Sequence, residues 1–297
     1  MGANPLLRRL GLADTDRVAI IHADDVGMCQ ASVEAFSRLD AFGLVACGAV
    51  MVPCPWAPEA GAYARAHPQA DLGVHLTLTS EWARYRWGPL STREKASGLL
   101  DAEGFFPRGN GEVQAAADPR AAALELETQI QRALELGIDV SHIDTHMGTV
   151  MHPKLIQTYI GLSLKYRVPG MIFRWDEAML RQRGLDADTA ALAARAIQDL
   201  ESAGAPLLDG MIGLDLGKPD ERLAHAKQAL DQLPAGVTHF IIHPAVDTPE
   251  LRAIAPDWRA RVADYETFMR VDLRQYIKDA GIVVLGYRAL RGLIRAG

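Results

Sequence analysis

Two adjacent carboxylates, Asp24 and Asp25, follow a short apolar run near the start of the chain. Neighbouring negative charges repel one another, and a divalent cation or a nearby base can offset that repulsion. The pair therefore indicates a metal site or an acid–base site. The simpler alternative is that one carboxylate caps the following helix, because residues 30–42 have helical spacing and aspartate is a common N-cap.

Histidines lie in or at the ends of three further apolar runs, which contain His75, then His142 and His146, then His243. Side chains alternate along a strand, so His142, Asp144 and His146 share one face of a strand and its exit. A lone strand histidine is more often a hydrogen-bonded core residue. Together, one carboxylate and two imidazoles with open positions form a site for Zn²⁺ or another divalent ion, and a further carboxylate and histidine could supply a base and an acid.

The elements that would position these residues alternate along the chain. Apolar runs typical of strands are separated by segments with helical spacing, which is the pattern of βαβ units on a parallel sheet. The clearest helices span residues 30–42, 119–136 with Asp118 as its cap, and 219–233. The predicted strands span residues 17–22, 44–52, 71–78, 140–144, 170–174, 207–212, 237–243 and 281–285.

The candidate polar residues gather at the carboxyl ends of these strands, which is where β/α barrels place their catalytic groups. We therefore predict an α/β protein made of a single irregular β/α barrel, similar to a TIM barrel, with seven or eight mostly parallel strands over residues 1–297. Segment 80–117 has little periodicity and is predicted to be a long loop insertion, a feature that in compact domains is usually functional or disordered.

The overall composition argues against several classes of partner. The 297 residues carry 31 basic and 37 acidic side chains without long basic runs, which gives no electrostatic footprint for nucleic acid or an anionic membrane. No apolar stretch reaches the roughly 20 residues of a membrane span. Residues 1–17 lack the apolar region of a signal peptide, so we expect a cytoplasmic protein. The cysteines Cys29, Cys47 and Cys54 lack disulfide or zinc spacing and are predicted to be small buried residues.

Four motifs in order along the chain resemble those of the YdjC-type carbohydrate deacetylases, a chitooligosaccharide deacetylase-like family. The family's Asn-Ala-Asp-Asp-Phe-Gly resembles residues 22–27, its Gly-x-His matches 73–75, its His-x-Asp-Ser-His matches 142–146, and its His-Pro-Gly with a following Asp is similar to 243–247. The match runs from His22 to about Leu251. Here His22 replaces the usual Asn, and residues 147–150 replace further histidines that often follow the third motif.

The resemblance implies an irregular β/α barrel and a role for each motif residue. Asp25, His75 and His146 would bind one divalent metal ion. Asp24 would be the base and His243 the acid in a hydrolysis that removes the acetyl group from an N-acetylated sugar. Zn²⁺ is expected first because imidazole suits it, while Mg²⁺, Co²⁺ or Ni²⁺ would also accept a carboxylate and open water positions.

Substrate contacts are predicted in two places. Segment 80–117 would cover the site, and Trp82, Tyr85 or Trp87 would line a sugar subsite, because aromatic rings pack on the apolar face of a pyranose. The alternative is a surface flap packed by its own aromatic side chains. Arg174, at a predicted strand end, is a further candidate substrate-binding residue.

Other functions stay open at this point. The same barrel could carry other metal-dependent sugar chemistry, such as isomerisation or phosphoester hydrolysis, or could bind carbohydrate without catalysis. A binding protein has no need of Asp24, which favours an enzyme. The expected partner is an N-acetylated sugar, small or oligomeric, and a homodimer is an open possibility. Asp247 or another nearby carboxylate is the candidate for orienting His243, whose simpler role is to hydrogen-bond the turn at Pro244.

Overall fold

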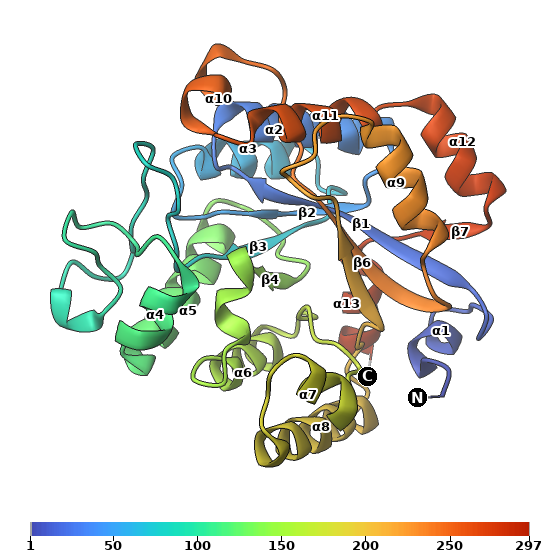
Figure 1. Ribbon diagram of the computed structural model, residues 1–297, viewed down its shortest axis with the longest axis horizontal. Coiled ribbons are helices and arrows are strands. Elements are labelled where there is room, and N and C mark those ends of the chain that lie inside the picture. Colours follow the sequence, from blue (N-terminus) through green and yellow to red (C-terminus); the bar gives the residue numbers. More distant parts are fainter. Residues whose placement is uncertain (1, 297) are drawn as a thin grey trace.

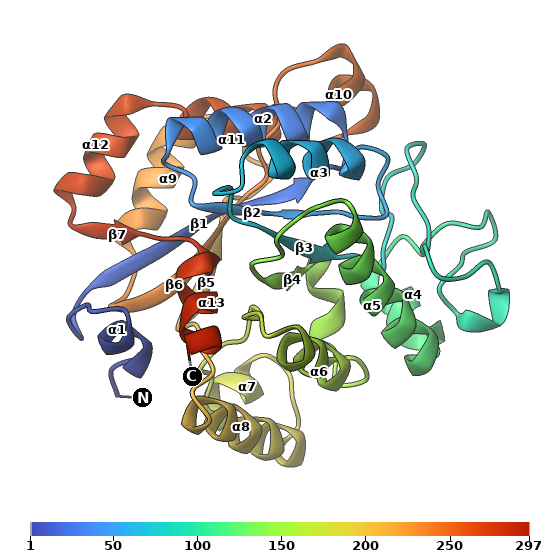
Figure 2. The same cartoon turned by 180° about the vertical axis from the view of Figure 1, so that it is seen from behind.

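The structure is a computed structural model that describes residues 2–296. Helices surround a curled sheet, and α1 and α13 lie side by side on one flank of it (Figures 1 and 2), where Arg9 donates a hydrogen bond to the backbone oxygen of Leu293. The strands are β1 (Arg17–Val26), β2 (Cys47–Val50), β3 (Leu72–Leu76), β4 (Ile143–Thr145), β5 (Gly210–Gly213), β6 (Gly236–Ile242) and β7 (Ile282–Val284).

The sheet is parallel and β1 lies at its centre. The strand order is β4-β3-β2-β1-β6-β5, and β7 also pairs with β1. One edge of β1 pairs with β6 from Arg17 to Ala23. The other edge is shared by two strands: β7 pairs with the amino-terminal half of β1, and β2 pairs with its carboxyl-terminal half. Because β1 has neighbours along both edges, it is almost fully buried and holds its carboxyl end in a fixed position.

The curled sheet forms a half-barrel, so the α/β class and the parallel strands are confirmed but the closed barrel is not. Among residues 2–296, the predicted strand 170–174 forms no ladder and makes only single bridges, Ile143 to Gly170 and Phe173 to Leu208. Pro169, at its start, has no N–H to donate to a neighbour. The segment therefore crosses the gap between β4 and β5 as extended chain, with isolated backbone hydrogen bonds to each side.

Helices cover the outside of the sheet. Helices α2 and α11 lie on one side of the molecule and α6 to α8 on the opposite side (Figure 1). Within the described residues they are α1 (Pro5–Arg9), α2 (Gln30–Phe42), α3 (Ala57–Ala66), α4 (Asn110–Ala116), α5 (Pro119–Glu135), α6 (Ile156–Tyr166), α7 (Glu177–Gln182), α8 (Ala187–Ser202), α9 (Arg222–Asp231), α10 (Pro249–Ile254), α11 (Trp258–Phe268), α12 (Val271–Asp279) and α13 (Tyr287–Ala296).

The three helices that are clearest in the sequence are all present. Helix α2 has the predicted bounds, and the carboxylate of Asp118 accepts hydrogen bonds from two backbone N–H groups at the start of α5, which confirms the predicted cap. Helix α9 begins later than predicted. Glu221, immediately before it, has a φ of 54°, a left-handed conformation that cannot continue a right-handed helix.

The insertion at 80–117 is more ordered than a loop. It contains the short 3-10 helix η1 (Lys95–Ser97) and α4, and its side chains Trp82, Trp87 and Phe106 are buried in the main hydrophobic core. Elsewhere, the three cysteines are free and buried, as predicted. None of the described helices is both long and apolar enough to cross a membrane.

Candidate metal and acid–base site

A pocket of about 610 Å³ opens at the carboxyl ends of the parallel strands. The structure brings the five predicted metal and acid–base residues together there, from the ends of β1, β3, β4 and β6. The pocket is lined by Asp24, Asp25, His75, Glu81, Trp82, His146, Met147, Leu216, Gly217, His243, Pro256, Asp257 and Arg261. This is the edge of a parallel sheet where ligands usually bind, because the connecting loops meet there.

The end of β1 is distorted in a way that serves this pocket. Successive side chains of a regular strand point to opposite faces, so Asp24 and Asp25 would normally diverge. Asp25 instead has a φ of 61°, and the register with β2 shifts between Ala23 and Val26. Both carboxylates consequently line the pocket. Helix α2 begins at Gln30 with Cys29 as its N-cap residue, so the alternative that Asp24 or Asp25 caps it is wrong.

Three side-chain atoms converge on one point of the pocket. Asp25 Oδ1 lies 3.4 Å from His75 Nε2 and 3.2 Å from His146 Nδ1. Asp25 Oδ1 is buried and has no hydrogen-bond partner within residues 2–296. Ligand atoms bound to one ion at about 2.0–2.2 Å lie roughly 3–3.5 Å from one another, so this trio has the spacing of a metal site. The three side chains fit one divalent cation.

The remaining ring nitrogens of both histidines are held by carboxylates. Asp144 Oδ1 lies 2.8 Å from His75 Nδ1, and Glu81 Oε2 lies 3.0 Å from His146 Nε2. Metal-binding histidines usually donate their second N–H in this way, which fixes the tautomer and the ring orientation. The arrangement therefore leaves Nε2 of His75 and Nδ1 of His146 facing Asp25 Oδ1. Glu81 was not predicted from the sequence, because it lies in the insertion and outside every motif.

The electrostatics of the trio favour positive charge. Burial lowers the pKa of His75, but Asp144, Asp24 and Asp25 together outweigh burial, and the pKa ends well above its usual value. Burial likewise acts against the charged form of His146, yet Glu81 and Asp25 raise its pKa to about 9. A site that draws protons onto two buried imidazoles presents a surplus of negative charge, and a divalent cation would satisfy the same carboxylates.

Arg261 of α11 is the second residue that the sequence did not reveal. Its Nη1 donates to Asp25 Oδ2 at 2.7 Å and its Nε donates to Asp257 at 2.9 Å, while the guanidinium lies 5.3 Å from the centre of the Trp82 ring. Burial raises the pKa of Asp25, but Arg261 and then His146 hold it well below its usual value. Arg261 thereby fixes Oδ2 of Asp25, while Oδ1 faces the two histidines.

Asp24 lies beside the trio with its two oxygens in different surroundings. Its Oδ1 lies 2.6 Å from His22 Nδ1, whereas its Oδ2 lies 3.7 Å from His75 Nε2 and 3.8 Å from His243 Nε2. Burial raises the pKa of Asp24, but the nearby histidines, His75 first, outweigh burial and hold it below its usual value. Asp24 is therefore an ionised carboxylate with one oxygen facing the pocket.

His243 follows β6 directly and faces Asp24. Its backbone N–H donates to Asp264 Oδ2 at 2.9 Å, and its Nδ1 is buried without a hydrogen-bond partner among the described residues. Of the candidates for orienting it, Asp247 or another nearby carboxylate, Asp247 is wrong, because its exposed carboxylate binds Arg252 instead. The carboxylate that contacts His243 is the buried Asp264 of α11, and it binds the backbone rather than the imidazole.

The predicted substrate-binding aromatics divide into two groups. Trp82 lines the pocket. Tyr85 and Trp87 do not line it, since the Tyr85 hydroxyl donates to the backbone oxygen of Met28 and the Trp87 indole donates to that of Thr79. These two rings pack with Trp82 inside the insertion, as the alternative of a self-packed flap expected.

Arg174 lies apart from the pocket. Its guanidinium forms ion pairs with Glu201 and Asp209, and it lines a different hollow with Asn4. The structure therefore does not bring Arg174 together with the other predicted site residues, and both carboxylate partners compete with any role in binding substrate.

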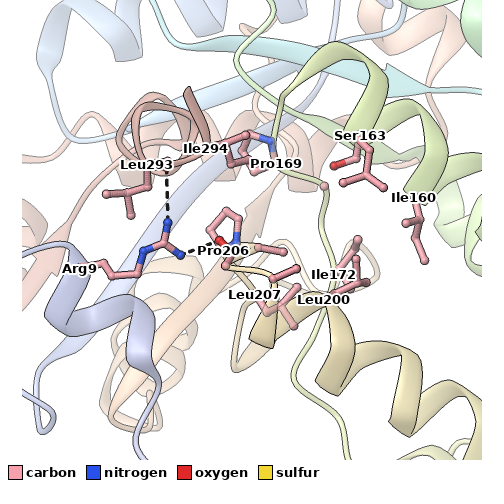
Figure 3. Close-up of a pocket in the computed structure, with 15 residues that line it drawn as sticks. Arg9, Ile160, Ser163, Pro169, Ile172, Leu200, Pro206, Leu207, Leu293 and Ile294 are labelled. Carbon is pink, nitrogen blue, oxygen red and sulfur yellow. Dashed lines mark hydrogen bonds between the residues drawn. The ribbon is translucent and has the colours of Figure 1, made fainter. Parts of the chain in front are cut away.

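A further pocket of about 400 Å³ opens where segment 169–172 meets the end of α8 (Figure 3). Its described lining is mostly apolar and contains neither histidine nor carboxylate. Arg9 reaches into it, but donates hydrogen bonds to the backbone oxygens of Gly204 and Leu293. Nothing in this lining resembles an acid–base or metal site, so the pocket at the strand ends is the candidate functional site.

Known proteins that are similar to this chain cover nearly all of it. A profile of the YdjC-like protein family matches residues 18–279. The carbohydrate deacetylase of Thermus thermophilus is 35% identical over 286 residues, which are 96% of this chain and 98% of that protein. The carbohydrate deacetylase of Thermoanaerobacter pseudethanolicus is 27% identical over 92% of this chain and 98% of that protein.

A solved structure is similar in fold. The crystal structure of a candidate cellobiose-phosphate cleavage protein from Enterococcus faecalis matches with a TM-score of 0.73 and 22% identity, covering 93% of this chain and 99% of that one. At this level of identity the likeness concerns the fold alone. The family profile spans most of the chain and the Thermus relative matches it almost end to end. The chain therefore belongs to the YdjC-like protein family.

Proposed function

We propose that this protein is a metal-dependent hydrolase that removes the acetyl group from an N-acetylated sugar. The observation that carries the proposal is the convergence of Asp25 Oδ1, His75 Nε2 and His146 Nδ1 in a pocket that also contains Asp24 and His243. The names of the curated relatives, carbohydrate deacetylases, support the same chemistry.

One divalent ion would be held by Asp25, His75 and His146. Zn²⁺ is the first expectation because two of the three ligands are imidazoles, and Mg²⁺, Co²⁺ or Ni²⁺ are alternatives. When bound, the ion supplies Lewis acidity, which polarises the amide carbonyl and makes a water molecule more acidic. Arg261, Asp144 and Glu81 would orient the ligands.

Asp24 and His243 would move the protons. Water attacks the carbonyl carbon of the acetamido group, and Asp24 Oδ2 accepts its proton. His243 Nε2 then gives a proton to the leaving nitrogen as the carbon–nitrogen bond breaks, which releases acetate and a free amino sugar. An unprotonated amide nitrogen is too basic to depart, and histidine can hold and release a proton near neutral pH.

Acetate release is the direct test of the proposed function. The purified protein is incubated with a panel of N-acetylated sugars, from monosaccharides to oligosaccharides, with Zn²⁺, Mg²⁺, Co²⁺ or Ni²⁺ in separate reactions. We expect stoichiometric acetate and free amine from at least one sugar. Sugar isomers or inorganic phosphate as products, or tight sugar binding without any product, would favour the alternative functions of this fold.

His243→Ala should separate amide from ester hydrolysis. We expect kcat on an N-acetyl sugar to fall by ~10²-fold or more, and by less than ~10-fold on an activated acetyl ester, because a good leaving group needs little protonation. The measurement is steady-state kinetics on both substrates together with metal titration of the variant. Equal losses on amide and ester would count against a role as the acid.

Trp82→Ala should weaken sugar binding. Loss of the aromatic face that lines the pocket is expected to raise KM by roughly 10-fold with a smaller change in kcat, since a buried aromatic contact contributes about 1 kcal/mol beyond its area. Tyr85→Phe is the matched control: it removes a hydroxyl that bonds Met28 outside the pocket, and KM should stay within about 2-fold. A fall in kcat with unchanged KM would instead indicate that the Trp82 ring holds the guanidinium of Arg261 in place and does not contact the sugar.

A further inference from the structure

A chain of buried hydrogen bonds runs from Asp24 into the protein core. His22 Nδ1 lies 2.6 Å from Asp24 Oδ1, and His22 Nε2 lies 2.7 Å from His142 Nε2. The other nitrogen of His142, Nδ1, lies 2.8 Å from Ser141 Oγ. His22, His142 and Ser141 are fully buried, so water does not compete for any of these contacts.

Packing fixes the two imidazole rings in this chain. The Tyr287 ring stacks on His142 with centroids 4.0 Å apart and an angle of 17°. On β3, a Cβ at Gly73 would lie 2.5 Å from the His142 ring, so only glycine leaves room for the ring at this position. His239 packs against His22 with ring centroids 4.6 Å apart. The rings therefore have little freedom to turn or to exchange partners.

One arrangement of hydrogens gives each contact of this chain one donor and one acceptor. Asp24 is the base in the proposed function, so its Oδ1 accepts across the 2.6 Å contact and His22 Nδ1 carries the hydrogen. Burial lowers the pKa of His142 well below its usual value, so that ring is neutral and carries one proton. If Ser141 donates to His142 Nδ1, the proton of His142 lies on Nε2 and is donated to His22 Nε2. Every donor in the chain then meets one acceptor.

We propose that His22 is a positioning residue for Asp24, held in its Nδ1–H tautomer by His142 and Ser141. Its N–H binds Asp24 Oδ1 and leaves Oδ2, the oxygen that faces His75 and His243, as the proton acceptor. The inference rests on the proposed function, in which Asp24 is the base. It assigns a task to a buried histidine that the proposed function does not use, and it gives the reason why Oδ2 of Asp24 is the oxygen that reacts.

The tautomers can be measured without activity. Metal-free protein with ¹⁵N-labelled histidine is recorded in long-range ¹H–¹⁵N NMR spectra, with His22→Asn and His142→Gln used to assign the two rings. We expect His22 protonated only at Nδ1 and His142 only at Nε2, and Ser141→Ala should disturb the His142 signals without unfolding the protein. A His22 ring protonated at Nε2, alone or at both nitrogens, would overturn the proposal.

Kinetics test the positioning role. The amide nitrogen of Asn can occupy the place of histidine Nδ1, so His22→Asn should keep kcat within about 10-fold, while His22→Leu, which has no donor, should lose about 10²-fold. KM and the metal affinity of both variants should stay within about 2-fold. Equal loss of kcat in both variants, or loss of metal affinity in His22→Leu, would contradict the role.

A matched control separates positioning from general damage to the core. Tyr287→Phe keeps the ring that stacks on His142 and removes only the hydroxyl that bonds His239 Nδ1 at 2.9 Å, so it deletes a buried hydrogen bond outside the chain to Asp24. We expect its kcat to stay within about 2-fold of the parent. The proposed function has its own test, because it fails if the parent protein releases no acetate. In that case the NMR spectra still show whether the hydrogen-bond chain exists.

Discussion

Asp24→Asn should lower kcat for acetate release by ~10²-fold or more while the affinity for the metal stays within about 2-fold. The amide has the size of the carboxylate and can still accept the hydrogen bond from His22, but it cannot take a proton from water. Because Asp24 Oδ2 lies 3.7 Å from His75 Nε2, the substitution leaves the ligand in place. Steady-state kinetics and isothermal titration with Zn²⁺ measure the two quantities.

The same titration distinguishes the base from a ligand-orienting residue. If Asp24 served to orient His75, the Asn variant would bind the metal more weakly and would regain activity at higher metal concentration. Glu81→Gln offers the comparison, since Glu81 contacts His146 and is placed only as an orienting partner. Its loss should appear in metal affinity, by about 10-fold to 100-fold, rather than in kcat at saturating metal.

Removal of the metal should have the other large effect. Dialysis against a chelator is expected to lower activity by roughly 10³-fold or more, because Lewis acidity contributes several kcal/mol to the transition state. One equivalent of Zn²⁺ should restore the parent protein but not His75→Gln or Asp25→Ala. His67→Gln, which alters an exposed histidine stacked on Tyr63, is the matched control and should regain full activity. Full activity after verified metal removal would contradict the proposal.

The sequence predicts where the site lies because the end of each strand is marked by a local pattern of residues. Apolar runs followed by Asp24 and Asp25, by His146 and by His243 indicate buried strands with polar exits, and parallel strands bring those exits to one edge. The same logic predicts the helix cap at Asp118, where the pattern is local. Features that depend on a few neighbouring residues are therefore recovered.

Features that depend on distant contacts are not recovered. Arg261 meets Asp25 from 236 positions away, and nothing around it distinguishes it from other helical arginines. Asp247 is near His243 in sequence, yet Arg252 takes its carboxylate, while the buried Asp264 contacts the backbone of His243. The tertiary fold determines the partners in such ion pairs, so a local sequence pattern does not predict them.

Barrel closure and the end of β1 illustrate the same limit for the backbone. Residues 170–174 have the composition of a strand, but they form only single bridges to the chain on either side. Whether they form a ladder depends on the distance between β4 and β5. The left-handed conformation of Asp25 is also not predictable from its residue type, because aspartate can adopt this conformation but does so rarely. Such strain at a functional position is sustained by the surrounding structure, here by Arg261 and the two histidines.

Anomalous diffraction can locate a divalent ion held by Asp25, His75 and His146. Crystals soaked in a zinc salt are measured on both sides of the zinc absorption edge. We expect one strong peak about 2.0–2.2 Å from Asp25 Oδ1, His75 Nε2 and His146 Nδ1. An anomalous map without a peak among these three atoms, from crystals of protein that binds zinc in solution, would contradict it.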